Sequence, residues 1–208
     1  MNNRIIITGS GNCGTTFLIK LLSELGLDTG WTAEEVKEAV KHRPTSSFEW
    51  PVRGERSLLH LPQPYILKHP HLCFDLRGRI ERWDWNVEHV YVLLREWEHV
   101  ASHKHQQYFG REEQPQRYRE SFLKEGILTD TEFKEYHEMK AASAIGNIMI
   151  PLVEDNIPHT FIMFPRMITD PVYLFYRLNV VLGEMRYTDF LEGFNKIADV
   201  KEVHWGLK

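Results

Sequence analysis

The stretch RIIITGSGNCGTTFLIKLLSELG, residues 4–26, decides the fold of this chain. It begins with three isoleucines at positions 5–7, a β-branched run typical of a strand buried on both faces. Residues 8–14 are rich in glycine, and from Thr15 onward the leucines recur at a helical period until Gly26, a suitable helix end. A strand, a glycine loop and a helix in this order aim backbone N–H groups and a helix N-terminus at an anion. We therefore expect the loop to bind a phosphate or sulfate group.

Length and composition narrow the class of protein. A chain of 208 residues fits one domain, and an apolar share of 42% is enough for a hydrophobic core. The net charge of -4 gives no basic footprint, so we expect no nucleic-acid partner. Cys13 and Cys73 do not form a disulfide framework and favour a reducing interior. No segment has the pattern of a signal peptide or a membrane span, so we expect a cytoplasmic protein without membrane attachment.

Further strands alternate with helical segments along the chain. Alternation of this kind implies parallel strand pairing with right-handed crossovers, and hence a three-layer α/β fold with the glycine loop at its ligand edge. The expected strands are 5–7, 65–68, 89–94 and 159–164. Helices are expected to begin at Thr15, Ala33, Asp75, Glu96, Asp170 and Tyr187, with Thr32 as the cap of the second. A further helix is expected to reach residue 153 and to have Asp130 or Thr131 as its cap.

We expect a single domain over residues 1–208, in which residues 108–158 form a mostly helical insertion or lid. Two polar segments that carry glycine and proline, 42–54 and 108–126, are expected to face an acceptor substrate, because long loops in compact domains often bind ligands. The alternative is that they are surface segments with no role in binding.

Basic residues follow two of the expected strands. Lys68, His69 and His71 come at the end of the second strand, and Arg95 comes directly after the third. Ligands of open α/β sheets bind outside the carboxyl ends of the strands, so these side chains are suitably placed for chemistry. An arginine is also the preferred fork for a phosphate group. The alternative for Arg95 is a structural ion pair with a neighbouring glutamate.

Several familiar loop chemistries do not fit. The loop has the length of a nucleotide-kinase P-loop, but the position of the P-loop lysine holds Thr15, which disfavours an ordinary ATPase or GTPase. The dinucleotide pattern of Gly9, Gly11 and Gly14 lacks the acidic residue expected about 20 positions further on. A phosphatase built on Cys13 would need an arginine closing the loop, and none follows.

Gly14-Thr15-Thr16-Phe17, at the junction of loop and helix, resembles the 5′-phosphosulfate loop of the sulfotransferase family. A second segment agrees, because a strand ending at Arg95 and a helix carrying Ser102 are similar to the family's 3′-phosphate segment. A third and weaker similarity covers residues 164–183, where an Asp-Pro pair precedes a helix that ends in Leu-Gly. The three segments occur in family order.

The resemblance implies a P-loop NTPase-like fold and transfer of a sulfuryl group from 3′-phosphoadenosine 5′-phosphosulfate to a hydroxyl or amine of a small-molecule or glycan acceptor. The product would be adenosine 3′,5′-bisphosphate, and no metal would be required. Lys68 would stabilise the bridging oxygen, and His69 or His71 would accept the acceptor's proton. The implied cofactor-binding residues are Ser10, Gly11, Asn12, Cys13, Gly14, Thr15, Thr16, Phe17, Arg95, Ser102 and His103.

The chain also departs from the family pattern. The basic residue of the family loop aligns with Asn12, which carries no charge, so Lys68 or another side chain would have to replace it. Ser102 lies seven residues past Arg95, and His103 holds the eighth position where the family serine usually stands. Two other functions therefore stay open: a P-loop kinase-like phosphotransferase, and a non-catalytic nucleotide-binding protein of the same fold.

Two further patterns have simple structural explanations. His99 and His103 have the i, i+4 spacing that can hold a metal ion, but no third ligand is evident, and we expect a solvated or anion-facing helix side instead. Trp83 and Trp85 could stack on a purine, and we expect them to pack the linker before the third strand.

Overall fold

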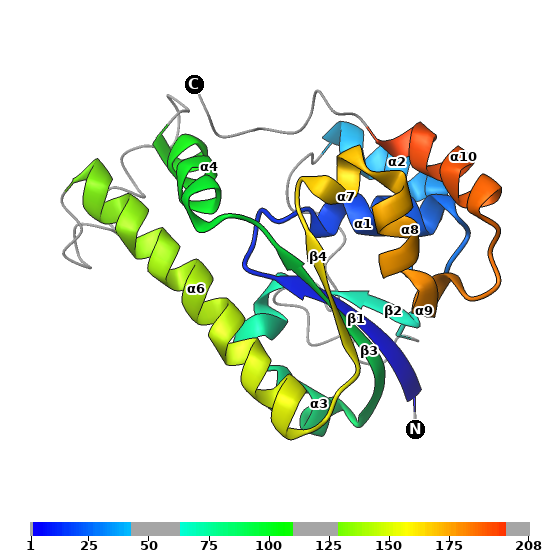
Figure 1. Cartoon of the computed structure of the whole chain (residues 1–208), viewed down its shortest axis with the longest axis horizontal. Helices are drawn as coiled ribbons and strands as arrows, with labels where there is room; N and C mark the ends of the chain where they lie inside the picture. Colours follow the sequence, from blue (N-terminus) through cyan, green and yellow to red (C-terminus); the bar gives the residue numbers. More distant parts are fainter. Residues whose placement is uncertain (1, 43–62, 110–128, 199–208) are drawn as a thin grey trace.

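The computed structural model describes residues 2–42, 63–109 and 129–198, which form helices around a parallel sheet (Figure 1). Its strands are β1 (Asn2–Gly9), β2 (Ile66–Lys68), β3 (Trp85–Leu94) and β4 (His159–Met163). They lie in the order β2-β1-β3-β4, and every pairing between neighbours is parallel. The predicted α/β class, with helices flanking a central parallel sheet, is confirmed.

The central strands are buried on both faces, as their apolar runs predict. Ile5 and Ile7 belong to the core on one face of the sheet, and Ile6 belongs to the core on the other. The residues of β3 alternate in the same way, because Tyr91 belongs to the first core and Val92 to the second. All five residues are completely buried. The period of two in a strand thus separates two cores, one on each side of the sheet.

One face carries the helix that follows the glycine loop. There α1 (Thr15–Glu24) contacts α10 (Tyr187–Ile197) and α2 (Ala33–His42), as Figure 1 shows on the right of the sheet. Leu18, Leu21 and Leu22 of α1 are completely buried there, which confirms the predicted leucine stripe. The short helices on the same side are α7 (Arg166–Thr169), α8 (Pro171–Arg177) and α9 (Asn179–Leu182).

The opposite face is covered by the long helix α6 (Asp130–Glu154), which contacts the 3-10 helix η2 (Pro70–Phe74) and α3 (Leu76–Trp83). η2 in turn contacts β1, and α3 contacts β3. Ile148 and Leu152 of α6 join Ile6 and Val92 in the second core. The N-terminal half of α6 packs against α4 (Trp97–Phe109) above the sheet in Figure 1. Part of the segment predicted as an insertion or lid thus contributes to the central core.

Some predicted boundaries are wrong. Thr129, and neither Asp130 nor Thr131, caps α6: its hydroxyl accepts a hydrogen bond from the Glu132 N–H (3.2 Å), and the Glu132 carboxylate accepts one from the Thr129 N–H (2.8 Å). This reciprocal pair is a capping box, which satisfies two orphan donors at once. β3 begins at Trp85, so this residue lies in a strand and not in a linker, and its ring lies edge-on to Trp83 with centroids 4.6 Å apart.

Other boundaries shift by one or two residues. α3 begins at Leu76, α4 begins at Trp97 and includes the residues up to Phe109, and β4 ends at Met163, one residue before the predicted end. The loop predicted at residues 42–54 lies outside the described residues, except for its first residue, and so does the segment at 108–126, except for its first two. Within the described part of the chain, every helix is too short or too polar to cross a lipid bilayer.

Candidate functional site

The candidate site lies at the carboxyl ends of three adjacent strands. Lys68 is the last residue of β2, the glycine loop follows β1, and Arg95 follows β3. Because β1 lies between β2 and β3 in the sheet, the loop has a basic residue on either side. The register supports this placement, since Ile7 is paired with Lys68, and Gly9 with Leu93. The predicted meeting of these residues at one edge of the sheet is therefore found in the structure.

The backbone of the loop turns through left-handed conformations. Gly11, Asn12 and Gly14 have φ angles of 84°, 52° and 89°. Gly14 is the N-cap residue of α1 and has no side chain that could cap the helix, although the N–H of Thr15, the first of α1, hydrogen-bonds to the Cys13 side chain. Left-handed residues in a loop that leads into a helix N-terminus can turn backbone N–H groups toward a common point, which is an anion-binding arrangement.

The surroundings of Gly11 leave room for a ligand. A Cβ atom built on Gly11 would have no heavy atom of the described residues within 4 Å, so space lies open beside this part of the loop. Next to it, the side-chain nitrogen Nδ2 of Asn12 is buried and has no hydrogen-bond partner within the described part of the chain. A buried donor of this kind is costly unless a ligand oxygen accepts from it. The loop thus offers both space and an unused donor.

Cys13 lies inside the loop, with its side chain completely buried. Burial raises the pKa of Cys13 to about 11, although hydrogen bonds from backbone N–H groups of the loop and the nearby charge of Lys68 act in the opposite direction. The thiol is therefore neutral at neutral pH. A neutral thiol is a weak nucleophile, which agrees with the sequence argument against a phosphatase.

The two basic side chains approach the loop from either side. Lys68 is 3% exposed, and its charge acts on Cys13. Arg95 is 6% exposed, and its Nη1 donates a hydrogen bond to the carbonyl oxygen of Asn12 (3.1 Å). Burial lowers the pKa of Arg95, while Cys13 and Glu96 raise it, and the group stays charged. The site therefore concentrates positive charge around a ring of backbone donors.

The other residues predicted for the site occupy different surroundings. Thr15 is buried and Thr16 and Ser10 are half-buried, all in or beside the loop. Phe17 lies on the face of α1 that packs against α10, where its ring meets Phe194 edge-on at 6.0 Å. Phe17 thus has a packing role, and its part in cofactor binding stays a prediction.

For the predicted histidines and Ser102, the structure shows chiefly the element in which each residue lies. His69 is buried, and its N–H donates to the Ile7 carbonyl (3.0 Å), which extends the β1–β2 ladder past Lys68. His71 lies in η2 and His103 in α4, and the structure describes only their backbone. Ser102 is half-buried in α4, about two helical turns beyond Arg95. The roles of these residues stay predictions.

A metal centre finds no support in the described residues, among which no three His, Cys, Asp or Glu side chains form a group able to hold an ion. His99, one of the two histidines with metal-ligand spacing, pairs instead with Glu96, with 3.1 Å between Nδ1 and Oε2.

Phe164 and Met167 were missed by the sequence reasoning. Phe164 follows β4, and the Cζ atom of Arg95 lies 4.7 Å from the centroid of its ring. A Cβ atom on Gly14 would lie 2.8 Å from Cδ2 of Phe164 and 3.2 Å from Cε of Met167, so both residues pack against the loop. The rule that singled out Arg95 selects a side chain just past a strand, and it did not select Phe164 because the expected strand ran to residue 164, one residue past the observed end of β4.

Comparisons with known proteins find a distant structural likeness. No protein-family model matches the chain, and no curated protein matches it. A solved structure, the sulfotransferase domain from the Synechococcus PCC 7002 olefin synthase, is similar with a TM-score of 0.48 and 13% sequence identity, over 96% of this chain and 82% of that one. Such a distant likeness leaves the chemistry of this chain to be argued from its own residues.

Proposed function

We propose that this protein is a sulfotransferase that takes 3′-phosphoadenosine 5′-phosphosulfate as donor and acts on a hydroxyl or amine of a small-molecule or glycan acceptor. The observation that carries the proposal is the glycine loop flanked by the buried Lys68 and Arg95. Sulfuryl transfer needs mainly positioning and neutralisation of charge on the leaving oxygens, and a ring of N–H donors with two cations supplies both. We also propose that it acts in a reducing cytoplasm, because Cys13 and Cys73 are buried thiols that are not joined in a disulfide.

The residues of the loop fit such a donor. The space beside Gly11 and the unused donor of Asn12 are what an anionic ligand would fill. Backbone N–H groups of the loop and the hydroxyls of Thr15 and Thr16 would hold the 5′-phosphate, and Arg95 with Ser102 would hold the 3′-phosphate. The donor supplies an activated sulfuryl group when bound.

Lys68 has the central chemical role in this proposal. It is a buried cation whose charge acts at the centre of the loop, so it would neutralise the negative charge that develops on the bridging oxygen. Asn12 would add a neutral hydrogen bond there in place of the basic residue of the family. His69 or His71 would accept the proton of the acceptor.

The proposal is tested by calorimetric titration of the full chain with adenosine 3′,5′-bisphosphate. We expect binding that Lys68→Met and Arg95→Met each weaken at least tenfold, since each variant removes a charge-assisted contact in a buried site. Lys134→Met is the matched control, because it removes an exposed charge on α6. It should leave the dissociation constant unchanged.

Transfer itself is tested with labelled donor and a panel of hydroxyl and amine acceptors. Asn12→Lys should raise the transfer rate, because it restores the charge that the family loop carries. Binding of the bisphosphate without any transfer, in both the wild-type chain and Asn12→Lys, would identify a non-catalytic nucleotide-binding protein. Tighter binding of ATP with magnesium than of the bisphosphate would identify a phosphotransferase instead.

A further inference from the structure

Phe164 and Arg95 lie side by side at the carboxyl edge of the sheet. The N–H of Phe164 donates to the Leu94 carbonyl (2.7 Å), which continues the parallel β3–β4 ladder one residue past β4. The Cζ atom of Arg95 is 4.7 Å from the ring centroid of Phe164, and the two residues are 6% and 9% exposed. A guanidinium over an aromatic ring is attracted by the negative face of the ring, and more strongly so when water is excluded.

Phe164 also contacts the glycine loop. Its Cδ2 atom lies 2.8 Å from the position of a Cβ atom on Gly14, so only glycine leaves room for the ring at the start of α1. Arg95 touches the same loop through its hydrogen bond to the Asn12 carbonyl (3.1 Å). The ring, the guanidinium and the loop thus contact one another, although they come from three distant parts of the sequence.

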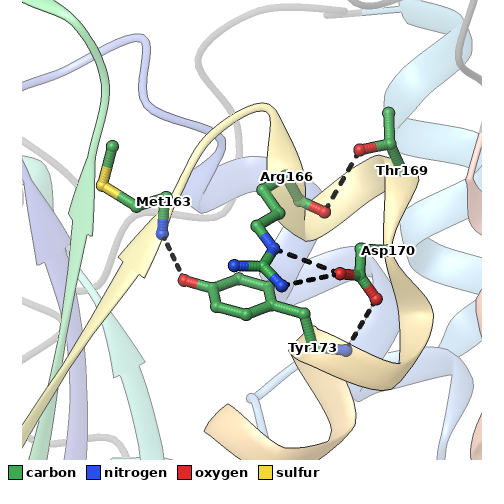
Figure 2. Close-up of polar contacts among 5 residues, drawn as sticks. All are labelled: Met163, Arg166, Thr169, Asp170 and Tyr173. Atoms are coloured by element: carbon green, nitrogen blue, oxygen red, sulfur yellow. Dashed lines mark hydrogen bonds and ion pairs between the residues drawn. The ribbon is translucent and has the colours of Figure 1, made fainter.

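The segment that follows Phe164 is fixed by a network of polar contacts (Figure 2). The Arg166 guanidinium donates to Oδ2 of Asp170 (3.0 and 3.1 Å) and lies over the Tyr173 ring, with Cζ 4.2 Å from its centroid. The Tyr173 hydroxyl accepts a hydrogen bond from the N–H of Met163 (2.9 Å), and Asp170 caps α8 by accepting from the N–H of Tyr173 (2.9 Å). Residues on both sides of Phe164 are therefore held in place.

We propose that Phe164 is a positioning residue, whose ring holds the Arg95 guanidinium beside the loop so that Arg95 meets the 3′-phosphate of the donor while the loop binds the 5′-phosphate. This inference rests on the proposed function and extends it to Phe164, the first residue of the third and weaker segment of resemblance, for which the resemblance implies no role in binding. Its physical basis is preorganisation: a guanidinium already restrained by the ring loses less conformational freedom when a phosphate binds.

The experiment is a double-mutant cycle measured by calorimetry on the full chain. Phe164→Leu and Phe164→Met remove the ring and keep an apolar side chain, and Arg95→Met removes the cation. Each variant and each double variant is titrated with adenosine 3′,5′-bisphosphate and with adenosine 5′-monophosphate. Phe161→Leu is the matched control, because Phe161 lies on β4, three residues before Phe164, and packs into the other core, where its ring meets His159 at 5.4 Å.

We expect Phe164→Leu to lower the preference for the bisphosphate over the monophosphate about tenfold, the effect of losing a buried cation–π contact. The same substitution should change the preference less than twofold in the Arg95→Met background. Phe161→Leu should leave the preference as in the wild-type chain. A merely structural role of Phe164 would lower the affinity for both nucleotides equally and in both backgrounds, and that result would overturn the inference.

The cycle is repeated with inorganic pyrophosphate, so that failure of the proposed function can be distinguished from failure of the inference about Phe164. If the wild-type chain binds pyrophosphate but not the bisphosphate, the proposed donor is wrong. Coupling between Phe164 and Arg95 in pyrophosphate binding would then still support Phe164 as the residue that positions Arg95. Additive effects on pyrophosphate binding, or no binding of either anion, would overturn the inference.

Discussion

At the scale of single residues, Gly11 and Gly14 have the same left-handed backbone but different surroundings. A Cβ atom on Gly11 would meet open space, whereas one on Gly14 would lie 2.8 Å from Phe164 and 3.2 Å from Met167. These two positions therefore separate the cost of backbone strain from the cost of a side-chain clash.

We predict that Gly11→Ala lowers the free energy of unfolding by about 1–2 kcal/mol, the cost of a left-handed alanine. Gly14→Ala should cost at least 1 kcal/mol more, because the added methyl group also overpacks the contact with Phe164. Urea unfolding measures both values. Equal losses for the two variants would show that Phe164 and Met167 do not press on the loop.

A second prediction concerns Cys13. Its pKa is raised to about 11 in the folded chain, above the value near 9 of an exposed thiol, so the folded state holds the proton more tightly than the unfolded state. The contribution of Cys13 to stability is therefore complete below about pH 9 and is lost as the pH rises toward 11, by about 2–3 kcal/mol in all.

The Cys13→Ser variant tests this effect, because serine keeps a small polar side chain that does not ionise in this range. Urea unfolding at a series of pH values from 8 to 11 should give a steeper fall in stability for the wild-type chain than for Cys13→Ser. Parallel curves would mean that the Cys13 thiol has an ordinary pKa. Tyrosines and lysines titrate in both chains, so the difference isolates Cys13.

The residues of the candidate site were predictable to the extent that they follow strands directly. Lys68 and Arg95 were found because the ends of two buried strands can be read from their apolar runs. The contacts of Arg95 with the Asn12 carbonyl and the Phe164 ring were not predictable, because they join segments far apart in sequence. Residue type alone also could not show that Phe17 packs against α10.

At the scale of elements, the start of α6 shows how a helix end is chosen. The sequence Thr129-Asp-Thr-Glu132 offers three residues that can cap a helix, and only the first has a glutamate three positions later to complete a capping box. Spacing to Glu132, more than residue type, decides the boundary.

We predict that Thr129→Ala lowers the free energy of unfolding by about 1 kcal/mol, since the cap hydrogen bond to the N–H of Glu132 is lost. Thr131→Ala is the matched control: it lies inside the helix and is exposed, so its stability should stay equal or rise slightly. Chemical denaturation distinguishes the two. A larger loss for Thr131→Ala would place the cap where the sequence first suggested it.

Most elements could be predicted from local patterns, and the largest error, at the start of β3, has a tertiary cause. α10 begins at Tyr187, as predicted, and its apolar residues follow one helical face. The start of β3 was placed four residues late, because Asn86 and Glu88 interrupt the apolar pattern and the first residues of β3 join the sheet through pairing with Asn2 and Asn3. Pairing between distant strands is a tertiary effect that a local pattern does not contain.

At the scale of the whole molecule, the sheet separates two cores. Leu22 of α1 is completely buried in the first core, and Ile148 of α6 is completely buried in the second. Parallel pairing followed from the alternation of strands and helices, so the layered architecture was predictable, whereas the strand order and the side of the sheet taken by each helix were not.

We predict that Leu22→Ala costs about 2–5 kcal/mol of unfolding free energy and Ile148→Val about 0.5–1.5 kcal/mol. In the double variant the two losses should add to within about 0.5 kcal/mol, because the residues share no contacts across the sheet. Equilibrium unfolding of the two single variants and the double variant measures the sum. A coupling above 1 kcal/mol would mean that the two cores respond as one.

The hydrogen bond to the Tyr173 hydroxyl affects association between molecules of this protein. β4 is an edge of the described sheet, and the N–H of Met163 points away from β3, where a strand of another molecule could pair with it. Exposed edges of this kind are templates for aggregation, and proteins commonly cover them. By accepting the Met163 N–H, Tyr173 removes a free donor from that edge beside the partly exposed Met163 side chain, and so protects the chain against edge-to-edge association.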